Sequence, residues 1–251
     1  MRLPATLALL LASLMPAAAG NALPDGFVYL RDVAPQIDQD IRYATADNFT
    51  GRPLPGYAAP ECVLRREVAQ ALARVEADLA RQHLGLKVYD CYRPARAVAA
   101  MWRWSQGESA GDKHFYPNVA KHELFSLGYI ASHSRHSAGI AVDLTLVALS
   151  SAPSSSARSR AAREAPCTAP AAARTGDGSL DKSPDMGTGF DCLDAKSYTN
   201  SAAVTAEQRR WRNLLKAAMG ARGFRNYFRE WWHYEYSGAP RHAYDFPIER
   251  R

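Results

Sequence analysis

The sequence predicts an α+β fold formed by one domain. Two kinds of pattern are mixed along its 251 residues: short β-branched or aromatic runs typical of strands, and amphipathic segments with helical spacing. No stretch repeats, and no linker separates one half of the chain from the other. Hydrophobic residues make up 47% of the chain, enough for a sizeable core.

The first half of the chain contains a strand, a loop, a helix and a second strand. Residues 27–30 are apolar, and a polar loop rich in Gly and Pro follows them. A helical face comes next, marked by apolar side chains at steps of four, three and four residues: Val68, Leu72, Val75 and Leu79. This helix is expected to end near Gly85. Residues 86–89 then predict a buried strand.

Further helices and strands are predicted after this point. Pro94 fits the first position of a helix, where proline is favoured. The β-branched, apolar residues 140–146 predict a strand. Thr205 and Gln208 have the spacing of a capping box, so a helix is expected from there to Gly220 or Gly223. Residues 227–236 are aromatic and predicted to be strand-like.

Two segments are set apart by their composition. Residues 1–19 have the features of a signal peptide: Arg2, an apolar run at 7–14, and three alanines at 17–19. Cleavage is expected after Ala19, with Ala22 as the second choice. Residues 148–182 are rich in Ser, Ala, Arg and Pro, which predicts a low-complexity insertion in a single domain spanning 20–251. No other segment approaches the roughly 18 apolar residues of a membrane span.

The predicted export indicates how the cysteines are used. They are four in number, and an even count in an oxidising compartment favours two disulfides. Three connectivities are possible, and we favour Cys62–Cys91 with Cys167–Cys192, because each pair brackets one local unit. No pair has the close spacing of a zinc-thiolate cluster.

The formal net charge of +6 becomes +5 when Arg2 leaves with the signal peptide. This mild excess suits an anionic cell-wall environment, although a solvated surface rich in arginine is the favoured interpretation. No basic run is interleaved with aromatic residues, so nucleic-acid binding is not expected. The sequence indicates no particular oligomeric state.

Two short motifs far apart in the chain supply the parts of a catalytic zinc site. His136 and Asp143 lie seven residues apart, and Glu230 precedes His233 by three. A hydrolytic zinc ion needs three protein ligands, an open position for water and a nearby base. His136, Asp143 and His233 are the expected ligands of one zinc ion, with Glu230 as the base.

Two alternatives stay open within these motifs. His133 lies three residues before His136 and could replace it as a ligand, although its spacing to Asp143 would then be ten. Glu235 is a second candidate base, because on an extended strand it would share the face of His233. Ligand sets of His and carboxylate favour zinc without excluding other divalent metals.

The complete pattern resembles the zinc D-alanyl-D-alanine dipeptidases of the VanX type. Ser-x-His-x-x-Gly-x-Ala-x-Asp is intact at 134–143, and Glu-Trp-Trp-His is present at 230–233. Further matches occur in the family's order, at 43–51, 90–94, 143–146 and 186–191. The resemblance spans the mature chain except the predicted insertion. It implies the Hedgehog-like α+β fold of D,D-peptidases, with a small central antiparallel sheet flanked by helices.

The resemblance also implies roles for particular residues. Arg93 would stabilise the oxyanion, and Asp191 would hold the free amino group of the substrate. Ser134 and Asp90 would belong to the substrate-binding region. Their structural alternatives are a turn-forming hydroxyl for Ser134 and an ion pair with Arg93 for Asp90. Gly139 would permit an unusual backbone angle before the strand.

The expected activity is zinc-dependent hydrolysis of D-alanyl-D-alanine, a small dipeptide, to free D-alanine. Dipeptidases of the VanX type work in the cytoplasm, so an exported form fits cell-wall dipeptide recycling or nutrient scavenging in the periplasm. The nearest alternative is a D,D- or L,D-carboxypeptidase acting on peptidoglycan stem peptides. An alternative of another class is a non-catalytic, zinc-stabilised binding module.

Overall fold

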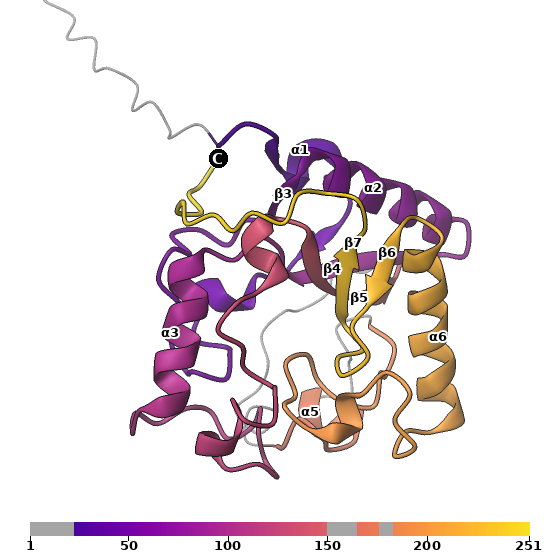
Figure 1. Cartoon of the computed structure of the whole chain (residues 1–251). Helices are drawn as coiled ribbons and strands as arrows, with labels where there is room; N and C mark the ends of the chain where they lie inside the picture. Colours follow the sequence, from indigo (N-terminus) through magenta and orange to yellow (C-terminus); the bar gives the residue numbers. More distant parts are fainter. Residues whose placement is uncertain (1–22, 150–164, 176–182) are drawn as a thin grey trace, which may run out of the picture.

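A five-stranded sheet forms the centre of the molecule, with strand order β2-β4-β5-β7-β6 (Figure 1). The computed structural model describes residues 23–149, 165–175 and 183–251. The strands of this sheet are β2 (Asp38–Gln39), β4 (Leu84–Asp90), β5 (Ala141–Ala148), β6 (Phe224–Asn226) and β7 (His233–Tyr236). A separate antiparallel pair consists of β1 (Phe27–Tyr29) and β3 (Val63–Arg65).

The prediction of an α+β fold is confirmed, but the central sheet is not wholly antiparallel. Strand β2 pairs parallel with β4, whereas the other pairs are antiparallel. The helix α2 (Arg66–Ala80) lies between β2 and β4 in the sequence. A connection of this length can return the chain to the same end of the sheet, as a parallel pair requires.

Three longer helices surround the sheet: α2, α3 (Ala95–Gln106) and α6 (Ala206–Gly220). In Figure 1, α2 and α6 lie toward one side of the sheet and α3 stands on the other. The shorter helical segments are α1 (Leu30–Val33), η1 (Arg42–Ala44), η2 (Lys121–Glu123), η3 (Arg135–Ala138), α5 (Ala171–Thr175) and η4 (Ala195–Ser197).

The helix signals in the sequence are largely confirmed. The predicted apolar face of α2 is buried, although the helix ends at Ala80 rather than near Gly85. Thr205 and Gln208 form the reciprocal capping box at the start of α6. Pro94 occupies the N-cap position of α3 rather than its first helical position, so this helix begins one residue later than predicted.

The prediction of a continuous strand-like segment at 227–236 is wrong in its first part. Residues 227–232 form the turn of a hairpin between β6 and β7. The buried indole of Trp231 donates to Thr188 Oγ1 at 2.8 Å, and the Trp232 carbonyl accepts from the Leu144 N–H at 3.1 Å. These tertiary contacts hold the aromatic residues in a turn rather than in a strand.

Both favoured cysteine pairings are present, Cys62–Cys91 and Cys167–Cys192. The predicted signal peptide and most of the predicted insertion, 150–164 and 176–182, lie outside the described residues. Of that insertion, the structure describes α5 and the disulfide-bonded Cys167.

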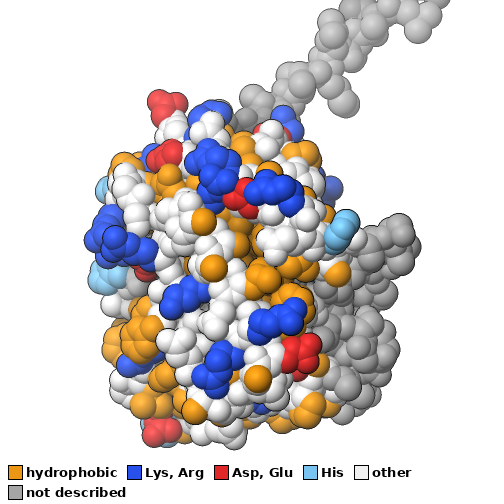
Figure 2. Space-filling model, turned by 90° about the vertical axis from the view of Figure 1, so that its right-hand side faces the viewer, with side chains coloured by type: hydrophobic (Ala, Val, Ile, Leu, Met, Phe, Trp, Pro, Cys, Tyr) orange, Lys and Arg blue, Asp and Glu red, His pale blue; other side chains and the backbone are white. Residues whose placement is uncertain are grey.

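The surface carries basic residues in several separate places. On the face shown in Figure 2, Lys and Arg side chains are interrupted by uncharged and hydrophobic surface. Within the described residues, no helix combines the length and apolar character needed to cross a membrane.

A buried carboxylate on α2 is expected to make stability depend on pH. Glu76 accepts the backbone N–H of Leu86 at 2.7 Å, yet burial, with repulsion from Asp38, raises its pKa to about 7. The folded state therefore holds a proton that the unfolded chain releases near pH 4.5. This contribution to stability, up to about 3 kcal/mol, is full below that pH and is lost as the pH rises through 7.

We expect Glu76→Gln, which keeps an acceptor oxygen without the charge, to be more stable than the wild type at pH 8. The difference should shrink at pH 5. Urea unfolding of both proteins at the two pH values measures this, and an equal difference at both would contradict it.

Candidate active site

The predicted zinc ligands His136, Asp143 and His233 come together at one end of the central sheet. Asp143 on β5 lies directly opposite His233 on β7 in the strand register. His136 lies in η3, just before β5, and its ring contacts both of these side chains. Strand pairing therefore joins two motifs that are 90 residues apart in the sequence.

The three donor atoms surround one point. His233 Nδ1 lies 2.9 Å from Asp143 Oδ1 and 3.2 Å from His136 Nε2, which is 3.3 Å from Asp143 Oδ1. Donors at zinc-ligand distance from a shared tetrahedral centre lie roughly 3.3 Å apart. Two imidazoles and a carboxylate with this spacing fit a zinc ion, and they are buried or nearly so.

The electrostatics of this group also fit a cation. Burial alone would raise the pKa of Asp143, but His136 and His233 hold it well below its ordinary value. Burial lowers the pKa of His233, yet its contacts with Asp143 and Glu235 raise it to about 10. The group thus holds a proton at neutral pH, which a metal ion would displace on binding.

The outer ring nitrogens of both histidines face oxygen atoms. His136 Nδ1 donates to the carbonyl of Cys91 at 2.6 Å, which leaves Nε2 facing Asp143. His233 Nε2 lies 3.6 Å from Glu235 Oε1, so Glu235 does share the face of His233 on β7. Contacts of this kind orient metal-binding imidazoles.

Local backbone geometry aims His136 into the site. Ser134 caps η3, because its hydroxyl accepts the His136 N–H at 3.2 Å. Gly139 ends this turn with a φ of 70°, and an added Cβ would lie 2.4 Å from the ring of Phe27. Only glycine satisfies both the left-handed backbone and this close approach. His133, the alternative ligand, is exposed and contacts Ser132 instead.

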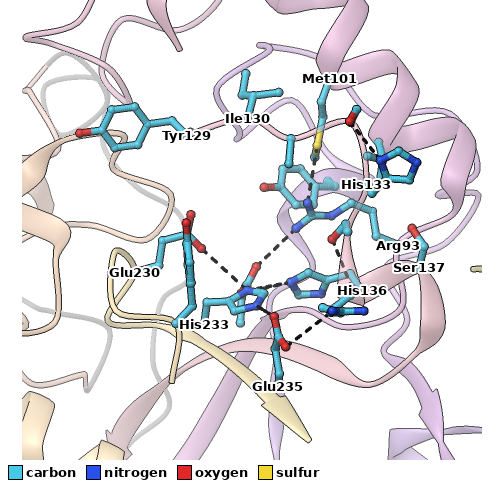
Figure 3. Close-up of a pocket in the computed structure, with 18 of the residues that line it drawn as sticks. Arg93, Met101, Tyr129, Ile130, His133, His136, Ser137, Glu230, His233 and Glu235 are labelled. Atoms are coloured by element: carbon cyan, nitrogen blue, oxygen red, sulfur yellow. Dashed lines mark hydrogen bonds and ion pairs between the residues drawn. The ribbon is translucent and has the colours of Figure 1, made fainter. Parts of the chain in front are cut away.

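Glu230 lies beside the three donors, in the turn before β7. Its Oε2 is 3.8 Å from His233 Nδ1, and burial raises its pKa above the ordinary value. The turn is fixed by Asn226, whose side-chain amide donates to the carbonyls of Glu230 and His233. Figure 3 shows the side chains of Glu230, His136, His233 and Arg93 directed toward one another.

The Arg93 guanidinium borders the same space and rests on a buried carboxylate. It contacts Asp90 Oδ2 at 2.8 Å and lies 3.5 Å from Asp143 Oδ2. Asp90 is fully buried, accepts the Tyr57 hydroxyl at 2.6 Å and does not line the cavity. The ion pair between Arg93 and Asp90 is therefore present, and Tyr43 stacks under the guanidinium at 4.8 Å.

Asp191 lies at another wall of the cavity, in an unusual backbone conformation. Its φ is 59°, and its Oδ2 accepts the Tyr43 hydroxyl at 2.7 Å. Burial raises the pKa of Asp191 to about 8 although this hydrogen bond opposes the shift. A cation at this carboxylate would restore the ionised form.

These side chains border a cavity of about 570 Å³. The polar residues of its wall include Tyr43, Arg93, Ser134, His136, Asp143, Asp191, Glu230 and His233. Val98, Met101 and Ile130 add an apolar side. The combination of convergent polar groups and an apolar wall is typical of a small-molecule site.

Three contacts of the site were not assigned from the sequence. Tyr43 begins one of the recognised motifs, so its position was a signal, but its contact with Asp191 was not foreseen. Tyr57 carries no comparable signal for its contact with Asp90. The carbonyl of Cys91 has no sequence signal at all, because every residue has one.

Comparison with known proteins points to one family. The Peptidase_M15 family, described as D-ala-D-ala dipeptidase, matches residues 24–153 and 159–250. A D-alanyl-D-alanine dipeptidase of Enterococcus faecium is 33% identical over 228 residues, covering 89% of this chain and 98% of the relative. Similar proteins bear the same name in Streptomyces coelicolor, at 34% identity covering 88% of this chain and 98% of the relative, and in Escherichia coli, at 29% identity covering 83% of each. The chain thus belongs to the D-Ala-D-Ala dipeptidase family of peptidases.

Proposed function

We propose that this protein is a zinc-dependent peptidase that hydrolyses D-alanyl-D-alanine to free D-alanine. The observation that carries the proposal is the convergence of His136 Nε2, Asp143 Oδ1 and His233 Nδ1 on one point beside Glu230. The names of the relatives support the choice of substrate.

His136, Asp143 and His233 would hold the zinc ion. Its chemistry would be that of a Lewis acid, which acidifies water and polarises a peptide carbonyl. Glu230 accepts the proton of the attacking water and later donates it to the leaving amine. The position of Glu230, 3.8 Å from His233 Nδ1 and partly buried, supports this role.

Arg93 and Asp191 act on two different groups of the dipeptide: the carbonyl oxygen of its amide and its free ammonium group. The guanidinium of Arg93 donates hydrogen bonds to the oxyanion as negative charge develops, and Asp90 holds it in orientation. Asp191 accepts hydrogen bonds from the free ammonium group of the dipeptide. A longer peptide has no ammonium group at that distance, so this carboxylate would favour dipeptides. Ser134 borders the cavity and contributes its hydroxyl to the substrate pocket.

The setting of the reaction is proposed on separate grounds. Two disulfides fit an oxidising compartment. Together with the predicted signal peptide, they support an exported, periplasmic enzyme that recycles or scavenges cell-wall dipeptides.

The test is the release of free D-alanine by the purified mature protein. D-Ala-D-Ala and a stem pentapeptide ending in D-Ala-D-Ala are compared with and without a chelator. We expect chelator-sensitive release from the dipeptide alone. Release from the pentapeptide would instead indicate a carboxypeptidase. No release from either by zinc-loaded protein would contradict the proposal and favour a binding module.

A further inference from the structure

We propose that the two disulfides position different parts of the site. Cys62–Cys91 holds the expected metal ligand His136, and Cys167–Cys192 holds Asp191, the expected partner of the substrate amine. The inference rests on the proposed function, but its first half concerns metal binding and can be tested without catalysis.

The first link is a hydrogen bond from a ligand to a disulfide-bonded residue. His136 Nδ1 donates to the Cys91 carbonyl at 2.6 Å. This contact fixes the ring orientation and the tautomer, so that the Nε2 lone pair faces Asp143 and His233. The strength of the metal site therefore depends on where the Cys91 carbonyl lies.

The position of Cys91 depends on its bridge. Strand β4 ends at Asp90, so Cys91 follows the last residue that the strand holds. The disulfide ties it to Cys62, which directly precedes β3, and both residues are buried. The neighbouring Tyr92 N–H donates to the Val63 carbonyl at 2.8 Å. The segment that orients His136 is thus anchored to β3.

The second bridge anchors a residue that no regular element holds. Asp191 has a φ of 59° and lies in a described segment, 183–194, without helix or strand. A left-handed conformation at a non-glycine residue persists where the surroundings determine it. The next residue, Cys192, is bonded to Cys167. The backbone of Cys167 is itself held in place. Its carbonyl accepts the Gly189 N–H at 3.0 Å, and its N–H donates to the His114 carbonyl at 2.9 Å.

The two bridges therefore have separable effects. Loss of the first bridge should weaken metal binding, because the Cys91 carbonyl, which accepts the hydrogen bond from His136 Nδ1, would no longer be held in place. Loss of the second should weaken substrate binding, because it lets Asp191 relax from its strained backbone. A purely structural role would lower thermal stability in both cases without separating these two properties.

The experiment compares Cys62→Ala/Cys91→Ala with Cys167→Ala/Cys192→Ala, each serving as the control for the other. Zinc dissociation constants are measured by competition with a chromogenic chelator, and KM and kcat with D-Ala-D-Ala. We expect the first pair to bind zinc about 10–100-fold more weakly, with KM of the zinc-saturated enzyme little changed. The second pair should keep the wild-type zinc affinity and show a KM raised about tenfold.

Other outcomes would overturn the inference. If both double variants showed equal changes in zinc affinity and in KM, or if only their melting temperatures changed, the bridges would only stabilise the fold. If Cys62→Ala/Cys91→Ala does not fold, Cys62→Val/Cys91→Ala refills the buried space. Failure of both variants would also contradict a positioning role. A wild-type protein that releases no D-alanine would count against the proposed function, whereas the zinc comparison would still test the His136 half.

Discussion

Replacing Glu230 with glutamine is expected to lower kcat for D-Ala-D-Ala hydrolysis by about 10²–10⁴-fold while leaving the zinc content unchanged. Glutamine has nearly the shape of glutamate but cannot accept the proton of the attacking water. Because Glu230 is not among the three converging donors, zinc binding should persist. Steady-state kinetics, together with metal analysis of the same sample, measures both quantities.

Glu235→Gln is the matched control for this prediction. Glu235 also lies near His233, but on the side of Nε2, at 3.6 Å, rather than on the side of Nδ1. Its side chain is 37% exposed against 20% for Glu230, and it faces the Arg135 side chain at 3.7 Å. We expect a much smaller loss of kcat in Glu235→Gln. The reverse ranking would identify Glu235 as the base.

Replacing Arg93 with alanine is expected to lower kcat by about 10²–10³-fold, the usual loss when one oxyanion donor is removed. Lysine should not restore it, because a single ammonium group cannot contact Asp90 and the oxyanion in the geometry of a planar guanidinium. The variant also leaves Asp90 buried without its cation, which is expected to cost about 3 kcal/mol of stability.

A double variant separates these two effects. Arg93→Ala/Asp90→Asn removes the unpaired charge and keeps an acceptor for the Tyr57 hydroxyl. We expect it to recover stability in urea unfolding without recovering kcat. Recovery of both would mean that Arg93 acts on folding alone and does not touch the oxyanion.

The sequence predicted the elements whose signals are local. The face of α2 and the capping box of α6 are determined by residues within a few positions of one another, and both are present. The parallel pairing of β2 and the turn at 227–232 depend on distant contacts. No period of hydrophobic residues reports such contacts, so these features could not be predicted from the pattern.

The same distinction applies to the site. Motif spacing was sufficient to select His136, Asp143 and His233, which the structure brings together. Which ring nitrogen of His233 faces the other two donors could not be predicted, because this depends on the orientation of β7 relative to β5. The hydroxyl of Tyr43 and the carbonyl of Cys91 reach the site through tertiary packing, and their contacts follow only from the fold.

The pairing of β7 with β5 has a consequence for when the three donor residues come together during synthesis and folding. During synthesis, His136 and Asp143 emerge long before His233, which lies 90 residues beyond Asp143. Until β7 takes its place between β5 and β6, the polypeptide offers only two of the three donors. We therefore expect the proposed zinc site to be complete only when β7 has paired with β5. A chain that ends before β7 would lack the third donor and is expected to be inactive. Metal binding would then indicate that β7 has reached its place in the sheet.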